Sequence, residues 1–308
     1  MSKQVLIATE KPFSPQALAA ATGILEDAGC AVRLLEGYKE KNALLEAVAE
    51  ANALIVRSDK ITADVIAAAT QLEIIVRAGA GYDNIDCPAA AERGIVVENT
   101  PGQNANAVAE LAIGMMLMGA RGKFSGKAGT ELLGKTLGLQ GFGNVARRLA
   151  KIAAGGFEMK VLAYDPYVPA ERIREAGAEP VESLEDLYRR SDYLSLHVPS
   201  LPETRGSVNY ALLSVMKSNA TLVNTARADI VDDEDLIKIY REKPHFLYLA
   251  DVPPSNKEQI VVCDETRCFF TPKKMGAQSA EANFNAATAA ARQITAFFEN
   301  GDTTFKVN

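Results

Sequence analysis

A glycine-rich turn between residues 138 and 146 has the residue types and spacing that can bind a pyrophosphate. The string Gly138-Leu-Gln-Gly141-Phe-Gly143-Asn-Val-Ala146 follows an apolar run and begins a helical one. Gly141 and Gly143 allow a tight turn and a close approach of the backbone to phosphate oxygens, and the small Ala146 lets helix pack on strand. The N–H groups at the start of that helix would then bind the phosphates. The string therefore predicts a dinucleotide site.

An acidic residue follows at the end of the next expected strand, which reads Tyr164-Asp165-Pro166. A carboxylate there can accept hydrogen bonds from both ribose hydroxyls, and it would repel a 2′-phosphate. The turn and Asp165 together favour NAD over NADP. The alternative is a nucleotide-free α/β turn with a solvated aspartate.

Further strings along nearly the whole chain resemble those of the D-2-hydroxyacid dehydrogenase family. In chain order they are Arg77-Ala-Gly-Ala-Gly-Tyr-Asp-Asn-Ile-Asp86, Asn99-Thr-Pro-Gly, Ala107-Val-Ala-Glu110, His197-Val-Pro-Ser-Leu-Pro-Glu-Thr-Arg205, Leu222-Val-Asn-Thr-Ala-Arg227 and Thr271-Pro272. Within the family, Arg57-Ser58, Asn104–Glu110 and Ala128-Gly-Thr-Glu131 look most like phosphoglycerate dehydrogenases of the short form, without a C-terminal regulatory domain. The resemblance implies NAD-dependent oxidation of D-3-phosphoglycerate to 3-phosphohydroxypyruvate, the first step of the phosphorylated serine pathway.

The resemblance also implies roles for individual residues. Arg227 would bind the substrate carboxylate and its hydroxyl or keto oxygen, for which a guanidinium fork is well suited. Backbone N–H groups around Ala80 and Gly81 would hold the carboxylate, Asp251 would meet the nicotinamide carboxamide, and His197 would line the cofactor. The other residues expected beside NAD are Phe142, Asn144, Val145, Pro166, Val198, Pro199, Thr204, Thr225, Ala226, Gly276 and Ala277.

Four further residues would suit a phosphate at the far end of the substrate: Arg57, Ser58, Arg77 and Asn104. Two arginines and two neutral donors provide the charge and the several hydrogen bonds that a phosphomonoester needs. A lactate-type enzyme would have no use for so much positive charge. The expected partner is therefore a small phosphorylated 2-hydroxy acid.

The chain departs from the family pattern at the catalytic pair. The family usually combines a glutamate, a few residues after an Asp-Val string, with a histidine in a Pro-His-x-Gly string. The histidine takes the hydroxyl proton as hydride leaves for NAD. After Asp251-Val252 this chain reads Pro-Pro-Ser-Asn-Lys-Glu, which puts Asn256 at the position of the glutamate.

Two lysines stand near the position of the histidine, in the string Pro272-Lys-Lys-Met-Gly-Ala277. An alignment anchored on Gly276 puts Lys274 there, whereas one anchored on Pro272 puts Lys273 there. We favour Lys274, because the glycine and the helix after it determine the geometry of approach.

The loss of the glutamate is compatible with a working lysine. A histidine uses a carboxylate to stabilise the imidazolium that it becomes. A lysine, with a reference pKa of about 10.4, must instead lose its proton to act as a base, and a carboxylate would oppose that. Burial, Arg227 and the cationic nicotinamide ring would all favour the neutral amine. The chain resembles a short, lysine-bearing subtype of phosphoglycerate dehydrogenase at this string.

Two alternatives remain open from the sequence. A hydroxypyruvate or glyoxylate reductase would carry the same sequence strings, but substitution of Arg57 or Arg77 would change its activity little because its substrate has no phosphate. A catalytically silent NAD(H)-sensing protein would bind NADH and turn over nothing, with both lysines solvated.

Short apolar runs alternate with helical patterns throughout, which predicts an α/β fold of two Rossmann-like parallel-sheet domains with an active-site cleft between them. Residues 1–98 with 278–308 are the expected substrate-binding domain, and residues 99–277 the NAD-binding domain. A helix over 104–120 is apolar almost all round, which indicates burial in the core or against another subunit. A homodimer is therefore expected.

Composition excludes several classes of protein. The chain has 308 residues and a formal net charge of −6, which argues against nucleic acid as a partner. We expect no membrane partner, because the most apolar segment is shorter than the ~20 residues that span a bilayer. The four cysteines do not form a metal-binding pattern, so we expect no metal and a reducing, cytoplasmic location.

Overall fold

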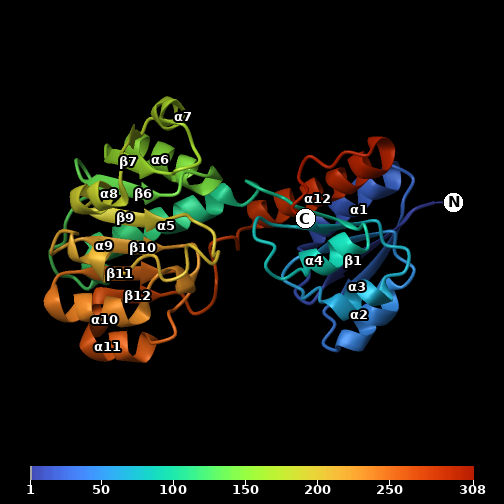
Figure 1. Cartoon of the computed structure of the whole chain (residues 1–308), viewed down its shortest axis with the longest axis horizontal. Coiled ribbons are helices and arrows are strands. Elements are labelled where there is room, and N and C mark those ends of the chain that lie inside the picture. The colour runs from blue at the N-terminus through green and yellow to red at the C-terminus, as the bar shows by residue number, and fades with distance from the viewer. Residues whose placement is uncertain (1) are drawn as a thin grey trace. The chain divides into compact units, whose positions relative to one another are not determined.

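The computed structural model describes residues 2–308, which form two compact units (Figure 1). Residues 2–104 and 278–308 make the first unit, and residues 105–277 make the second. The first boundary differs from the expected division at residue 98, because the segment after the last strand stays bonded to the first unit. Thr100 N–H donates to Gly79 O over 2.9 Å, and Gln293 Nε2 donates to Asn99 O over 3.0 Å.

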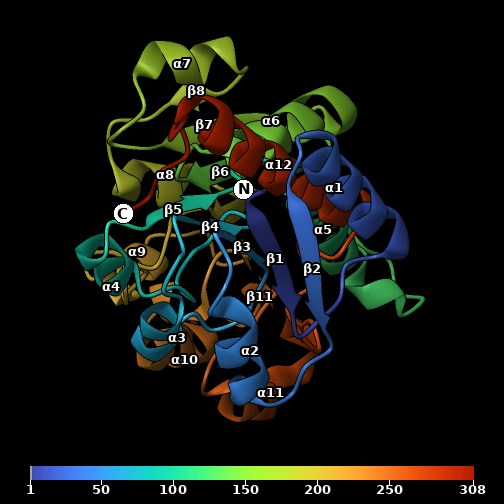
Figure 2. The same cartoon turned by 90° about the vertical axis from the view of Figure 1, so that its right-hand side faces the viewer.

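The first unit is a five-stranded parallel sheet with the strand order β2-β1-β3-β4-β5. Its strands are β1 (Gln4–Thr9), β2 (Ala31–Glu36), β3 (Ala53–Val56), β4 (Ile74–Arg77) and β5 (Val96–Asn99). Its helices are α1 (Pro15–Asp27), α2 (Lys41–Val48), α3 (Ala63–Ala68), α4 (Cys87–Glu92) and α12 (Ala280–Asn300). Helices α1 and α12 pack on one face of the sheet, and α2, α3 and α4 on the other (Figure 2).

Local sequence explains where the helices of the first unit begin and end. Ser14 caps α1 by accepting a hydrogen bond from Ala17 N–H over 3.2 Å, and Pro15 occupies the first turn. Ser279 caps α12 in the same way through Ala282 N–H over 3.0 Å, and Gly301 ends that helix in the left-handed region at φ 71°. The strands are continuous apolar runs, as expected for parallel strands that are buried on both faces.

The second unit is a seven-stranded parallel sheet with the strand order β12-β11-β10-β9-β6-β7-β8. Its strands are β6 (Thr136–Gln140), β7 (Lys160–Tyr164), β8 (Glu179–Pro180), β9 (Tyr193–Leu196), β10 (Thr221–Asn224), β11 (Leu247–Ala250) and β12 (Cys268–Phe270). Its α-helices are α5 (Ala105–Ala120), α6 (Asn144–Phe157), α7 (Ala170–Glu175), α8 (Leu184–Arg190), α9 (Tyr210–Ser214), α10 (Asp233–Glu242) and α11 (Lys257–Asp264). Short 3₁₀ turns occur at Gly122–Phe124, Ala228–Ile230 and Glu265–Arg267. The prediction of two Rossmann-like parallel-sheet units is confirmed.

Helices cover both faces of this sheet (Figure 1). Helices α5 and α6 enclose one hydrophobic core, and α8, α9 and α10 enclose the other. Met115 and Met116 of α5 are buried in the first of these cores, so packing within the unit accounts for much of the apolar character of the helix. Leu117 and Met118 remain half-buried.

Both strand orders place a topological switch point at the first strand of each sheet. In the first unit β1 lies between β2 and β3, and in the second β6 lies between β7 and β9. In open parallel sheets, ligands bind outside the carboxyl ends of the strands at such a point, because the connections leave in opposite directions there. The candidate residues of each unit should therefore gather at this edge.

Glu98 is a buried acid in β5, beside the C-terminal segment of the chain. Its side chain is 1 % exposed, and Lys306 forms an isolated antiparallel bridge with it. Val307 N–H donates to Val97 O over 2.9 Å, which holds the segment along the strand. Burial raises the pKa of Glu98 to about 7, the backbone hydrogen bond of Phe305 opposes this, and the charge of Asp302 adds to it.

Protonated Glu98 should therefore stabilise the first unit in acid. Its contribution is fully present below the unfolded pKa of about 4.5 and is lost as the pH rises through 7. In thermal unfolding across pH 4–8, the stability gain of Glu98→Gln over wild type should grow from near zero to about 1–3 kcal/mol. Glu92→Gln, at an exposed carboxylate on α4, is the control and should show no such growth. A difference that does not depend on pH would contradict this expectation.

No helix within residues 2–308 is both long and apolar enough to cross a membrane.

Candidate active site

The glycine-rich turn joins β6 to α6 in the second unit. Gly141 adopts φ 86°, and a Cβ there would lie 2.8 Å from His197 O, so only glycine fits. Gly143 begins α6 without any side-chain cap, and a Cβ there would meet no protein atom within 4 Å. The first-turn N–H groups of α6 are thus available to an anion, as the dinucleotide expectation requires. Ala146 is fully buried against the sheet.

Asp165, at the end of β7, is held beside this turn. Its Oδ2 accepts Phe142 N–H over 2.7 Å, and its Oδ1 accepts Tyr167 N–H over 2.9 Å. A carboxylate has about four acceptor positions, so each oxygen keeps one for a ribose hydroxyl. The same negative charge would oppose a 2′-phosphate.

His197 follows β9 and contributes both backbone and ring to the same edge. Its carbonyl faces Gly141, and Nε2 of its ring is buried without a protein hydrogen-bond partner in the described structure. Burial lowers the pKa of His197 to about 4, so the ring is neutral at pH 7. Thr225 Oγ1, at the end of β10, is likewise buried and unpartnered there. Buried polar atoms usually have partners, so these two suit a bound polar ligand such as NAD.

The loops that follow β9 and β10 are closed by their own hydrogen bonds. The Thr204 hydroxyl donates to Pro199 O over 2.6 Å, so it is engaged within its loop. After β10, Asn224 accepts Ala226 N–H over 3.0 Å and donates to Arg227 O over 2.8 Å. Asn224 therefore determines the path of the backbone that carries Arg227. No feature of the sequence analysis pointed to this role of Asn224.

Asp251 organises the turn that carries the two lysines. The residue is 1 % exposed at the end of β11. Its Oδ1 accepts Met275 N–H over 2.7 Å and the Thr271 hydroxyl over 3.1 Å, and its Oδ2 accepts Gly276 N–H over 2.8 Å. The Oδ2 atom keeps one acceptor position, which could receive the expected carboxamide. A Cβ on Gly276 would lie 2.9 Å from that oxygen, so a larger residue at this position would displace the Asp251 carboxylate.

The side chains of Lys273 and Lys274 are both exposed. The second unit therefore does not provide the burial that the sequence analysis expected for a reactive lysine. The turn lies beyond the end of β11, where Asp251 binds two of its backbone N–H groups. Asn256 begins α11 and donates through Nδ2 to Asp233 O over 2.7 Å.

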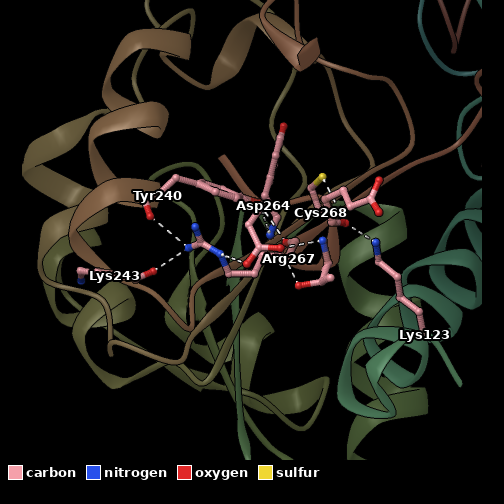
Figure 3. A network of polar contacts seen from close by, with 9 residues as sticks. Lys123, Tyr240, Lys243, Asp264, Arg267 and Cys268 are labelled. Atoms are coloured by element: carbon pink, nitrogen blue, oxygen red, sulfur yellow. Dashed lines mark hydrogen bonds and ion pairs between the residues drawn. The ribbon is translucent and has the colours of Figure 1, made fainter. Parts of the chain in front are cut away.

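An arginine network anchors β12, the strand that leads into the lysine turn (Figure 3). Arg267 donates through Nη1 to Tyr240 O over 3.0 Å and to Lys243 O over 2.9 Å, at the end of α10. Its Nε donates to Asp264 Oδ2 over 3.0 Å, and its guanidinium lies 4.7 Å from the Tyr240 ring centroid. This cation satisfies the last carbonyls of α10, a role that no motif had indicated.

The expected phosphate-binding residues lie in the first unit, and two of them are directly linked. Arg77 donates through Nε to Arg57 O over 2.9 Å, which joins the end of β4 to the residue after β3. A Cβ on Gly79 would lie 1.5 Å from Arg77 Nη1, so the glycine leaves room for this guanidinium. Ser58 is exposed and Asn104 is half-buried on loops of the same unit.

The expected carboxylate-binding backbone follows β4. Ala80 is exposed, Gly81 is half-buried, and Asn99 Nδ2 donates to Ala80 O over 2.5 Å. Every residue expected to bind substrate, except Arg227, thus belongs to the first unit. Arg227, the lysines and every residue expected beside NAD belong to the second. Pro166, Val198 and Ala277 follow β7, β9 and the lysine turn in that unit.

The chain is similar to known proteins over its whole length. The family model described as D-isomer specific 2-hydroxyacid dehydrogenase, NAD binding domain, matches residues 113–273. A solved structure of NAD⁺-bound 3-phosphoglycerate dehydrogenase from Entamoeba histolytica is 44% identical with a TM-score of 0.92, and the match covers 100% of this chain and 99% of that one.

Two curated relatives carry different names. A D-3-phosphoglycerate dehydrogenase of Methanocaldococcus jannaschii is 38% identical over 291 residues, covering 89% of this chain and 54% of the relative. A hydroxypyruvate reductase of Thermotoga maritima is 42% identical over 265 residues, covering 80% of this chain and 84% of the relative. The chain thus spans about half the length of the curated phosphoglycerate dehydrogenase but most of the reductase.

Proposed function

Because the chain belongs to the D-isomer specific 2-hydroxyacid dehydrogenases, we propose that it is an NAD-dependent D-3-phosphoglycerate dehydrogenase. It would oxidise the 2-hydroxyl of 3-phosphoglycerate to give 3-phosphohydroxypyruvate, at the start of the phosphorylated route to serine. The observation that carries the choice of substrate is the pair Arg57 and Arg77, joined at the carboxyl edge of the first sheet. Because Arg77 is bonded to the backbone of Arg57, both residues lie at this edge, and two guanidinium groups would match the charge and hydrogen-bonding needs of a phosphomonoester.

Each residue expected to bind substrate has its own role in this proposal. Arg57 and Arg77, with the neutral donors Ser58 and Asn104, would bind the phosphate. The N–H groups of Ala80 and Gly81 would hold the carboxylate, and Arg227 would bind the carboxylate and the C2 oxygen. The residues expected to bind the cofactor all belong to the second unit.

When bound, NAD supplies the acceptor for the hydride that leaves C2. The α6 N-terminus after Gly143 would bind its pyrophosphate, and Asp165 its ribose hydroxyls. Asp251, through the acceptor position left on Oδ2, would meet the carboxamide. The neutral ring of His197 and the hydroxyl of Thr225 provide polar atoms that suit the same ligand.

Lys274 would carry the proton of the reaction. In oxidation its neutral amine takes the C2 hydroxyl proton while the C2–H bond breaks and the C2–O bond becomes a carbonyl. In reduction its ammonium returns that proton to the keto oxygen. Because the second unit leaves the lysine exposed, the bound substrate and cofactor would have to remove water from around it.

A hydroxypyruvate reductase is the second candidate, favoured by the Thermotoga relative, which this chain matches over most of its length. The two candidates differ in whether the substrate bears a phosphate. A homodimer in the cytoplasm completes the proposal. The half-buried apolar residues of α5 support a homodimer, and four free cysteines support a cytoplasmic location.

The deciding experiment compares NADH oxidation with phosphohydroxypyruvate and with hydroxypyruvate. The wild type should prefer the phosphorylated substrate in kcat/KM. Arg77→Met should lower kcat/KM for phosphohydroxypyruvate about 10- to 100-fold, because charged hydrogen bonds are lost. It should change kcat/KM for hydroxypyruvate less than about 3-fold. Arg93→Met, an exposed arginine beyond α4, is the control. A preference for hydroxypyruvate would favour the reductase, and no turnover despite NADH binding would favour the sensor.

A further inference from the structure

The guanidinium of Arg57 is held in place by neutral groups from two segments of the first unit. Its Nη1 donates to Lys11 O over 2.9 Å and to Pro12 O over 3.1 Å, in the loop after β1. Its Nη2 donates to Asn283 Oδ1 on α12, and its Cζ lies 5.1 Å from the Phe13 ring centroid. These partners fix the direction of the side chain without adding negative charge.

The nearest carboxylate, Asp59, is bonded to other groups. Its Oδ1 accepts Glu10 N–H over 2.6 Å and the Tyr38 hydroxyl over 2.9 Å. Its Oδ2 accepts the backbone N–H of Arg57 over 3.0 Å. Asp59 therefore positions the backbone of Arg57, while the guanidinium itself is bonded to carbonyl and amide oxygens.

Asn283 is itself oriented by the start of α12. Its Nδ2 donates to Ser279 O over 2.7 Å, and Ser279 is the residue that caps the helix. Because the amide nitrogen is engaged there, the amide oxygen is the atom that faces Arg57. The amide thus connects the helix terminus to the guanidinium in one defined orientation.

We propose that Asn283 is a positioning residue that makes the chain selective for a phosphorylated substrate. This inference rests on the proposed function and extends it to a residue on α12. An amide oxygen holds the guanidinium without adding a second negative charge to that of Asp59, so a phosphate dianion meets an ordered cation. An aspartate at the same position would still accept from the guanidinium but would lose the bond to Ser279 O, and its negative charge would oppose that of Arg57.

Asn283→Asp tests the inference because it changes charge with little change in shape. For phosphohydroxypyruvate, kcat/KM should fall about 30-fold, mainly through KM, because the phosphate meets a neutralised arginine. For hydroxypyruvate, kcat/KM should stay within about 3-fold of wild type, because no phosphate contacts Arg57. Asn285→Asp is the matched control, because it adds the same charge two residues along α12, on an exposed side chain. It should leave kcat/KM for both substrates unchanged.

A second variant separates charge from orientation. Asn283→Leu removes the amide oxygen without adding charge, so KM for phosphohydroxypyruvate should rise less than in Asn283→Asp, by about 3- to 10-fold. Thermal unfolding of the three variants reports on the folding of the first unit, which contains Arg57 and Asn283. NADH affinity, measured by fluorescence titration, should stay at the wild-type value in all three.

Each outcome decides between the proposals. Equal losses with both substrates would show that Asn283 acts only on folding, and no loss with either would overturn its role outright. A wild type that prefers phosphohydroxypyruvate together with an unchanged Asn283→Asp would overturn this inference alone. A wild type that does not distinguish the two substrates would overturn the proposed function and this inference with it.

Discussion

Replacing Lys274 by methionine is expected to lower kcat about 1000-fold with phosphohydroxypyruvate and NADH, whereas Lys273→Met should stay within about 3-fold of wild type. A positioned proton donor contributes about 10²- to 10⁴-fold to such a reaction. Asp251 binds the N–H groups of Met275 and Gly276 directly after Lys274, so this lysine is adjacent to the fixed part of the turn. Methionine keeps the length of the side chain and removes the amine.

Activity in the oxidative direction should rise toward alkaline pH in the wild type, because the lysine must be neutral to accept the proton. That alkaline rise should persist in Lys273→Met. NADH affinity in both variants should match the wild type, which separates a chemical defect from a binding defect. Loss of activity in Lys273→Met alone would favour the alignment anchored on Pro272, and full activity in both variants would rule out a lysine as the acid and base.

Replacing Gly143 by alanine is expected to weaken NADH binding about 100-fold while leaving the fold intact. The Cβ of an alanine there would meet no protein atom within 4 Å, and the φ of −78° suits any residue. The second glycine of this turn is the one that lets the backbone approach the pyrophosphate. An added methyl group would therefore occupy space that the phosphate needs. It would weaken NADH binding without lowering the stability of the protein.

Fluorescence titration with NADH measures the loss of binding, and thermal unfolding without NADH measures whether the fold is intact. Gly155→Ala, later in α6, is the matched control because its Cβ also meets no protein atom within 4 Å. It should leave NADH affinity unchanged. Gly141→Ala is a poorer test, since its Cβ would collide with His197 O and disturb the turn itself. Wild-type affinity in Gly143→Ala would mean that the pyrophosphate does not lie against this turn.

Much of the fold could be predicted from local sequence because parallel strands that are buried on both faces appear as short apolar runs. The runs at Val5–Ala8, Ile74–Arg77 and Thr221–Asn224 correspond to β1, β4 and β10. Helix α4 has six residues and β12 has three, too few to show a helical or alternating period.

The division into units was displaced by six residues at its first boundary. Nothing in the local pattern after β5 marks the end of the first unit, because the segment through Asn104 is held by hydrogen bonds to distant residues. Gln293 on α12, for example, donates to Asn99 O from 194 positions away. Boundaries of this kind depend on the packing of the final helix.

The sequence by itself identified the residues on which the predicted chemistry rests: a glycine-rich turn, an acid at the end of the next strand, two arginines, and two lysines near the position of the family's histidine. These are properties of residue type and short spacing. Only the tertiary structure decided how the groups are held. Asp251 reaches Met275 and Gly276 across the end of a sheet, and Asn283 reaches Arg57 from 226 positions away. Such contacts follow from strand order and helix packing, which local patterns do not encode.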